Sequence, residues 1–252
     1  MVIPLYFNFF IKEYPTLNHA YNLLKKCKNN NKIIPEIWLD EGIHHNNIEC
    51  IEFPIMIAGI NNITTIIQNC LQFKIKEFYY GRSHLSINKS KTDGIVIINT
   101  KINIYDCIIS NNALAGLHIW NNSEFRLNNC KVNGNKSGLI IGNKTKGEIK
   151  NINCYDNKET GLSFGGGDYS QIKIKGKDTQ IYNNNIEKKK YSAGISCDYS
   201  AIIQIYNLSK MISNNNFNNY LLRGKRCKII FINKNCENEV IHNNTPEIDY
   251  YY

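Results

Sequence analysis

The feature that most constrains the fold of this chain is a repeated glycine followed by alternating apolar residues. Gly94, Gly116, Gly138, Gly161 and Gly194 each precede such a run, and successive glycines lie 22, 22, 23 and 33 residues apart. A fixed period of this size is the signature of a solenoid, in which each repeat is one structural unit that packs on its neighbours. We therefore expect a single repetitive domain.

A second marker, an Asn or Asp directly before a Cys, keeps nearly the same period. Asp106-Cys107, Asn129-Cys130 and Asn153-Cys154 are 23 and 24 residues apart, and the same device occurs further out at Asn69-Cys70 and Asn235-Cys236. If inward residues stack from unit to unit, Cys107, Cys130 and Cys154 form one interior file of buried thiols. The Asn or Asp before each Cys then forms a parallel file at a corner.

Apolar residues alternate within each unit, as in Leu117 and Ile119, which is the two-residue period of a β-strand. The strands are interrupted by Asn and Gly, for example Asn133-Gly134-Asn135, residues that tolerate the left-handed backbone of a sharp corner. This pattern predicts an all-β fold, a single-stranded parallel β-helix with 22–24 residues and three short strands per coil.

The ends and two irregular stretches complete the predicted layout. Apolar residues at Leu17, Ala20, Tyr21 and Leu24 have helical spacing, and a helix beside Thr16 would plug the end of the solenoid. We assign 1–36 to an N-terminal cap of strand and helix, 37–240 to the β-helix and 241–252 to a C-terminal tail. Two stretches break the period: 71–93 adds about a dozen residues to one coil, and Ile186–Ser192 lengthens the Gly161 coil by about ten.

Composition narrows the setting and the partners. The chain is rich in Asn, Ile, Lys and Tyr, the bias of an AT-rich genome, so some of the asparagine has no structural meaning. Lys and Arg outnumber Asp and Glu by 30 to 21, giving a net charge of +9, but the basic residues are scattered, so we do not expect a nucleic-acid partner. An oligomer is compatible with this fold.

Cysteine use and the N-terminal sequence bear on localisation. Nine cysteines without tight spacing indicate reduced thiols, hence an intracellular compartment, or a virion of a large DNA virus. The apolar opening lacks the basic segment and cleavage site of a signal peptide, and no run approaches the ~18 apolar residues of a membrane span.

The first coils carry a family resemblance. Ile37-Trp38-Leu39-Asp40-Glu41-Gly42-Ile43-His44, followed by Pro54-Ile55-Met56-Ile57-Ala58-Gly59-Ile60, resembles the opening of the pectate-lyase-like superfamily and its carbohydrate-binding and sugar-hydrolase (CASH) repeats. The likeness is one of pattern and covers roughly residues 16 to 240. It implies a right-handed β-helix, and it makes a polysaccharide lyase or glycoside hydrolase the alternative to a binding module.

The catalytic motifs of those relatives do not match. Hydrolases of this kind carry an adjacent Asp pair and a Gly-His-Gly, and neither occurs, while Arg223-Gly224-Lys225 is only a weak match to their Arg-x-Lys. Other carboxylates remain open as a catalytic pair, namely Asp106, Asp156, Asp168, Asp178 and Asp198. We expect no metal or cofactor, because no Cys-x-x-Cys pair occurs and His44, His45 and His84 lack ligand spacing; calcium enters only with the lyase alternative.

The predicted outer face of the glycine-led strands supplies the candidate site. If Leu117 and Ile119 point inward, His118 and Trp120 point outward, and the equivalent outward positions are Val96, Ile98, Ile140, Gly142, Ser163, Gly165, Ser196 and Asp198. This face contains one carboxylate and no Arg or Lys. We expect Val96, Ile98, Trp120 and Ile140 to form an apolar row that docks a protein or glycan partner, with Trp120 as anchor.

Further residues border this row. His118 and Arg82 lie at its edge, and Tyr79 and Tyr80 belong to the adjacent stretch 71–93. The alternative is that this stretch, or the tail Glu247–Tyr252, folds over the row and covers it. We expect a non-catalytic β-helix module, with a virion or scaffold component as one setting.

Overall fold

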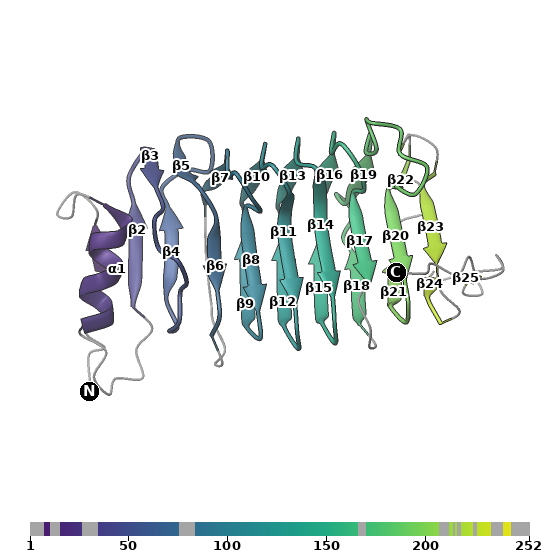
Figure 1. The fold of residues 1–252 in the computed structure, drawn as a ribbon, viewed down its shortest axis with the longest axis horizontal. Helices are drawn as coiled ribbons and strands as arrows, with labels where there is room; N and C mark the ends of the chain where they lie inside the picture. Colours follow the sequence, from purple (N-terminus) through teal and green to yellow (C-terminus); the bar gives the residue numbers. More distant parts are fainter. Residues whose placement is uncertain are drawn as a thin grey trace.

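The molecule is an elongated stack of coils with one helix at its N-terminal end (Figure 1). The computed structural model describes residues 8–10, 16–26, 35–75, 84–165, 170–206, 212–213, 215, 218–223, 226–232 and 239–242. It is an all-β parallel solenoid with one short helix, as predicted. Three long sheets run along the stack, and the chain visits them in turn, so each coil contributes one strand to each face.

The three faces are referred to as sheets B, C and D. Sheet B comprises β3 (Gly42–His45), β5 (Thr65–Gln68), β7 (Ser86–Asn88), β10 (Ile108–Ser110), β13 (Lys131–Asn133), β16 (Asn153–Tyr155), β19 (Gln180–Tyr182) and β22 (Ile212–Ser213). Sheet C comprises β6 (Leu71–Phe73), β8 (Ile95–Ile98), β11 (Ala115–Trp120), β14 (Ser137–Gly142), β17 (Leu162–Gly165), β20 (Ile195–Asp198) and β23 (Tyr220–Arg223). Sheet D comprises β9 (Lys101–Tyr105), β12 (Glu124–Asn128), β15 (Lys146–Lys150), β18 (Gln171–Lys175), β21 (Ile202–Tyr206), β24 (Lys228–Ile232) and β25 (Glu239–His242).

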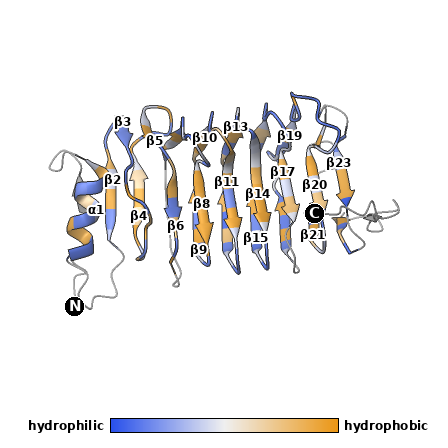
Figure 2. Cartoon of the chain, viewed as in Figure 1, coloured by the Kyte–Doolittle hydropathy of each residue, from blue (hydrophilic) through white to orange (hydrophobic). Residues whose placement is uncertain are grey.

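Neighbouring strands are parallel and in register throughout these sheets, except that β25 pairs antiparallel with β24 at the end of sheet D. A short sheet A of β1 (Asn8–Phe10), β2 (Glu36–Leu39) and β4 (Met56–Gly59) begins the stack. Alternate residues enter the interior, where they form continuous files such as Ile97, Ile119, Ile141 and Phe164, all buried. The strands are mainly hydrophobic and the connection between β19 and β20 is hydrophilic (Figure 2).

Helix α1 (Leu17–Lys26) covers the N-terminal end of the stack, as its apolar spacing predicts. Its Leu17, Ala20, Tyr21 and Leu24 are buried, and Thr16 caps it by accepting a hydrogen bond from the amide of His19. Lys25 and Lys26 occupy the last turn, where positive charge favours the helix dipole.

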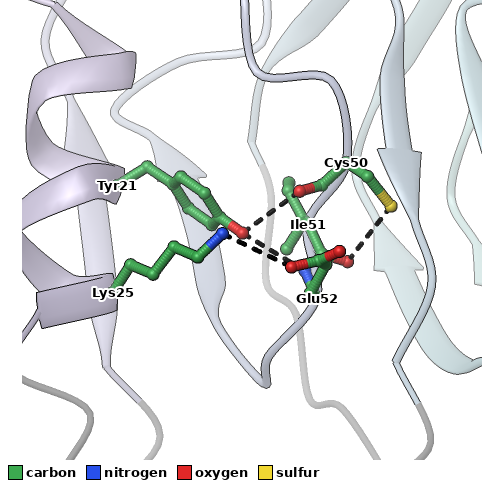
Figure 3. A network of polar contacts seen from close by, with 5 residues as sticks. All are labelled: Tyr21, Lys25, Cys50, Ile51 and Glu52. Atoms are coloured by element: carbon green, nitrogen blue, oxygen red, sulfur yellow. Dashed lines mark hydrogen bonds and ion pairs between the residues drawn. The ribbon is translucent and has the colours of Figure 1, made fainter.

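A polar network fixes the helix to the first coil (Figure 3). The Tyr21 hydroxyl donates to the carbonyl of Cys50, 3.1 Å away, and accepts from the amide of Glu52 at 3.2 Å. The Tyr21 ring stacks on Phe53 with centroids 5.0 Å apart, and Lys25 lies 3.4 Å from the Glu52 carboxylate. The ring buries apolar surface while its hydroxyl satisfies two backbone groups of the coil.

Buried asparagine side chains form a ladder at the corner between sheets B and C. Each ladder residue accepts two hydrogen bonds, from the backbone and side-chain amides of the Asn one coil earlier, at 2.8–3.3 Å. The members are Asn112, Asn135, Asn157, Asn184 and Asn215. The side-chain amides of the last four also donate to backbone carbonyls such as Val132 O. These asparagines therefore have a structural role, whatever bias composition adds.

The repeated glycines lie beside this ladder, which explains why they keep its period. A methyl group at Gly94 would stand 2.6 Å from the Asn112 side chain and 2.7 Å from the carbonyl of Gly116. The same crowding recurs at Gly116, Gly138, Gly161 and Gly194. At the corners, Asn111, Asn121 and Asn129 have φ values of 55°, 52° and 54°, the left-handed conformation that the sequence predicts there.

The predicted cysteine file is wrong in one member. Cys107 and Cys130 lie in neighbouring coils just before the paired residues Ile108 and Lys131, but Cys154 pairs with Val132 and so lies two positions further along. All three are buried, as predicted. The corner file likewise continues with Asn151 (φ 50°) and not with Asn153.

The outer Asn-Cys pairs do not extend this file either. Asn69 lies between β5 and β6, at the corner from sheet B to sheet C, whereas Asp106 lies between sheets D and B. Asn235 and Cys236 fall outside the described residues.

The predicted insertion at 71–93 is also wrong, whereas the later one is confirmed. Leu71 pairs with Ile95, so this coil advances by 24 residues, which is an ordinary length. Leu162 pairs with Ile195, an advance of 33. Of this excess, six residues fall between β19 and β20, because Tyr182 and Ile195 are 13 apart while Tyr155 and Leu162 are 7 apart.

Candidate ligand-binding face

The outer surface of sheet C has the register predicted for the candidate site. One file of side chains comprises Gln72, Val96, His118, Ile140, Ser163, Ser196 and Leu221, and the neighbouring file comprises Ile98, Trp120, Gly142, Gly165, Asp198 and Arg223. Val96, Ile98, His118, Trp120 and Ile140 are all partly exposed. The structure therefore brings these five predicted residues together on three adjacent strands, β8, β11 and β14.

Trp120 borders a strip of the face that lacks side chains. A methyl group at Gly142, its neighbour on β14, would lie 3.3 Å from the indole ring, so the ring leans toward this glycine. Gly165 follows on β17, and a methyl group there would be 3.3 Å from Cβ of Asp198 on β20. Gly142 and Gly165 thus form a glycine strip between an aromatic ring and a carboxylate.

Asp198 and Arg223 close the far end of the glycine strip. The Arg223 guanidinium donates two hydrogen bonds to the Asp198 carboxylate, from Nε and Nη2, both 2.7 Å long. This bidentate geometry fixes the plane of the guanidinium. The expectation that the face has no Arg or Lys is wrong, because β23 adds Arg223 one strand beyond the positions considered from sequence.

Hydroxyl groups and an imidazole line the file beside the strip. The Ser196 hydroxyl lies 3.2 Å from that of Ser163. His118 Nδ1 lies 3.0 Å from Asp93 Oδ2, and Asp93 Oδ1 accepts a hydrogen bond of 2.7 Å from the amide of Ala115. His118 also contacts Trp120, with ring centroids 4.8 Å apart, so Asp93 holds the imidazole and the imidazole supports the indole.

Asp93 was missed by sequence reasoning, and the signal for it was weak. It lies directly before Gly94, at the corner that leads into β8, where no alternation assigns a direction to the side chain. Burial, followed by the nearby Asp93 carboxylate, raises the pKa of the Cys70 thiol to about 11. Cys70 is therefore protonated at neutral pH and is not an activated nucleophile.

The remaining predicted residues do not converge on this face. Asp106 pairs with His84 at 3.2 Å at the corner between sheets D and B, and Asp156 lies at the corner between sheets B and C. Asp168, Tyr79, Tyr80, Arg82 and the tail Glu247–Tyr252 fall outside the described residues. Within the part of the chain that the structure describes, no three His, Cys, Asp or Glu side chains gather as a metal site would require.

The coil geometry agrees with the family comparison. Residues 80–245 match the family model described as "Right handed beta helix region". The chain belongs to this right-handed β-helix family. As a right-handed β-helix it is similar in fold to a solved structure, ORF18 of Geobacillus virus E2, with a TM-score of 0.55 and 10% sequence identity. That match covers 92% of this chain but 63% of the viral protein.

Two further observations accompany this assignment. No curated protein matches the β-helix in sequence. Among the described residues, the β-helix has no helix that is both long and apolar enough to span a membrane.

Proposed function

We propose that this β-helix is a non-catalytic module that binds a glycan on the outer face of sheet C. The observation that carries the proposal is the partly exposed Trp120 ring beside the glycine strip of Gly142 and Gly165. An aromatic ring offers an apolar surface on which a sugar ring stacks. The strip leaves room for that sugar, because two successive strands have no side chain there.

Polar groups around the strip suit the hydroxyl groups of a sugar. Ser163, Ser196 and the Asp198–Arg223 pair supply hydroxyls, carboxylate oxygens and guanidinium donors along one side and one end. Since Arg223 holds Asp198 in place, these groups keep fixed directions before a ligand arrives. A few fixed polar groups around an apolar contact are typical of small-ligand sites.

The spacing of carboxylates supports binding over hydrolysis. Asp93 contacts His118 on β11, and Asp198 lies on β20, three strands further along sheet C. Three strand spacings amount to roughly 14 Å. The two carboxyl groups of an inverting glycoside hydrolase lie about 6.5 to 9.5 Å apart, and those of a retaining enzyme lie closer.

A protein partner is the second candidate, and the apolar part of the face favours it. Val96, Ile98 and Ile140 surround Trp120 with aliphatic side chains, as at the centre of many protein interfaces. The fold shared with a Geobacillus virus protein also supports a virion or scaffold setting for such a partner.

Affinity gels with immobilised polysaccharides, together with a glycan array, test the proposal. The wild-type chain should be retarded by at least one polysaccharide, and Trp120→Ala should abolish the retardation while lowering the melting temperature only slightly. Tyr199→Ala is the matched control, because it removes an aromatic ring that is 53% exposed and lies outside the face. No binding by the wild-type chain, or equal binding by Trp120→Ala, would contradict the proposal.

A second variant separates the ligand classes. Gly165→Val places a side chain in the glycine strip and should weaken a stacked sugar, while leaving contacts around Val96, Ile98 and Trp120 intact. Loss of glycan binding in both variants supports the sugar site. If the wild-type chain instead captures a purified protein partner, sensitive to Trp120→Ala but not to Gly165→Val, the protein candidate replaces the glycan.

A further inference from the structure

The fold gathers basic residues that are scattered in the sequence onto the outer face of sheet D. Outward side chains on β9, β12, β15 and β18 include six cations, Lys101, Arg126, Lys146, Lys150, Lys173 and Lys175, against the two carboxylates Glu124 and Glu148. We refer to these eight side chains as the basic face. The scatter that argued against a nucleic-acid partner therefore does not hold on this side of the molecule.

Ion pairs neutralise the margins of the basic face and leave its centre positive. Lys101 lies 3.0 Å from Glu124, and Lys175 lies 2.7 Å from Glu148. The four other cations, Arg126, Lys146, Lys150 and Lys173, are exposed on three adjacent strands. Lys146 and Lys150 are roughly 13 Å apart along β15, and Arg126 and Lys173 are roughly 10 Å apart across it, by ordinary strand dimensions.

The chemistry of this face fits an acceptor-only ligand. Arg and Lys side chains have N–H donors and no acceptors, so their natural partners are phosphate, sulfate or carboxylate oxygens. The two acceptor side chains with negative charge, Glu124 and Glu148, are already in ion pairs. Sugar hydroxyls, which both donate and accept, suit the outer face of sheet C better than this one.

The shape of the face separates nucleic acid from a membrane. A membrane-binding surface places large apolar side chains beside its basic residues so that they enter the lipid boundary. Among the described residues, the large hydrophobic side chains that are well exposed are Ile43, Ile60, Ile63, Leu114, Ile186, Tyr191 and Tyr199, and none of them lies on sheet D. The face is a flat strand surface with charged and amide side chains at its exposed positions.

We infer that the basic face binds the phosphate backbone of double-stranded nucleic acid without reading its sequence. A duplex has one negative charge per ~1.7 Å of its axis, so a flat group of four cations meets several phosphates at once. The net charge of +9 adds long-range attraction. This site is independent of the glycan site, because the two lie on different sheets.

Fluorescence anisotropy with a labelled DNA duplex of about 20 base pairs tests the inference. Binding should weaken steeply between about 50 and 200 mM salt, with a slope of log K against log salt near −3.6, or about −0.9 per phosphate for four contacts. The quadruple variant Arg126→Gln, Lys146→Gln, Lys150→Gln, Lys173→Gln should lose at least about tenfold in affinity and most of the slope.

A charge-matched control decides whether position or total charge matters. Lys89→Gln, Lys91→Gln, Lys136→Gln and Lys158→Gln remove four exposed lysines along the corner between sheets B and C, so both quadruple variants have a net charge of +5. The control should bind the duplex nearly as tightly as the wild-type chain. Equal weakening of both variants would overturn the inference, as would a wild-type chain that does not bind the duplex.

Competing polyanions and stability complete the test. If heparin or phosphatidylserine vesicles bind through the four basic residues and the duplex does not, the assignment to nucleic acid is wrong. Should the quadruple variant melt earlier than the control, the pair Arg126→Gln and Lys173→Gln is measured instead, with a smaller loss expected. Trp120→Ala should bind the duplex normally, so failure at one site is distinguishable from failure at the other.

Discussion

Individual side chains in the asparagine ladder illustrate how a polar residue stabilises an otherwise apolar interior. Asn157 is fully buried, and its amide group both donates and accepts toward the coils on either side. Only a side chain with a donor and an acceptor at the same distance from the backbone satisfies these partners. Aspartate, serine and leucine each leave at least one of them without a hydrogen bond.

Asn157→Asp should therefore destabilise the fold strongly. The new carboxylate would face the carbonyl of Val132 and the Asn184 oxygen, both of which now accept hydrogen bonds from Asn157, so we expect a loss of about 3–5 kcal/mol. Urea unfolding of the purified variant measures this loss. Asn111→Asp, an exposed change at the same type of corner, is the control and should cost less than about 1 kcal/mol. Similar midpoints for the two variants would contradict a structural role for the ladder.

Buried thiols make stability depend on alkaline pH. Burial raises the pKa of Cys154 and Cys130 well above the value of 9.0 that a thiol has in the unfolded chain. Because the folded state holds these protons more tightly, the thiols stabilise it fully below pH 9, and this contribution is lost as pH rises above 9. For Cys70, with a pKa of about 11, the loss falls between pH 9 and 11.

Urea midpoints measured under reducing conditions from pH 8 to 10.5 test this dependence, over a window chosen around the unfolded thiol pKa of 9.0. The midpoint should fall with rising pH, by up to about 1.4 kcal/mol per pH unit for each fully buried thiol. Cys154→Ala removes one such thiol, so its curve should fall less steeply than that of the wild-type chain, whatever its absolute stability. Parallel curves would mean that Cys154 ionises as easily in the folded state as in the unfolded one.

At the scale of strands and corners, the glycines that mark the period are needed for coil spacing and not for turning. Gly116 has no left-handed φ, yet a methyl group there would lie 2.7 Å from Val132 Cγ1 and 2.9 Å from the carbonyl of Gly138. In an uncrowded strand, Ala in place of Gly stabilises slightly, by about 0.4–1 kcal/mol. The sign of the effect therefore reports crowding.

Gly116→Ala should destabilise the protein by about 1–3 kcal/mol, since adjacent coils would have to separate locally. Gly165→Ala, in which the methyl group first meets the Asp198 side chain at 3.3 Å, should change stability by less than about 1 kcal/mol. Thermal melts of the two variants provide the comparison. A stabilised Gly116→Ala variant would show that the coils tolerate the extra methyl group.

The sequence predicts the period, the helix cap and the direction of strand side chains, because each depends on local alternation. It misplaces Cys154 for a physical reason: a shift of two residues keeps a side chain on the same side of a strand, so alternation does not detect it. Asp93 and Arg223 escape for other reasons, since one is at a corner and the other follows a coil of irregular length. The basic face depends on which third of each coil a lysine occupies, and alternation does not determine this.

At the scale of the whole molecule, each coil contacts mainly its immediate neighbours, so stability is a chain of adjacent interfaces. The coils between β8 and β18 have neighbours on both sides and carry most of the asparagine ladder. Coils at the two ends have a neighbour on one side, with α1 as the cover at the N-terminal end.

Hydrogen–deuterium exchange followed by mass spectrometry should therefore show a gradient along the stack. Peptides from β11, β14 and β17 should exchange slowest, and those from β22 and β23 should exchange sooner. Leu24→Asp, which places a charge under the helix, should speed exchange in β2 and β4 while leaving β14 unchanged. Uniform exchange throughout would show that the coils open together and not from the ends.

The parallel register along sheets B, C and D also sets how the molecule responds to force. Its interstrand hydrogen bonds run along the long axis of the stack, because each strand pairs with the same face of the next coil. A pull on the two ends of the stack loads the coils in series, so the weakest interface peels first and its neighbours follow one at a time. A sideways load on one sheet is instead shared among several strands in parallel, which makes the molecule soft in tension and stiff in shear.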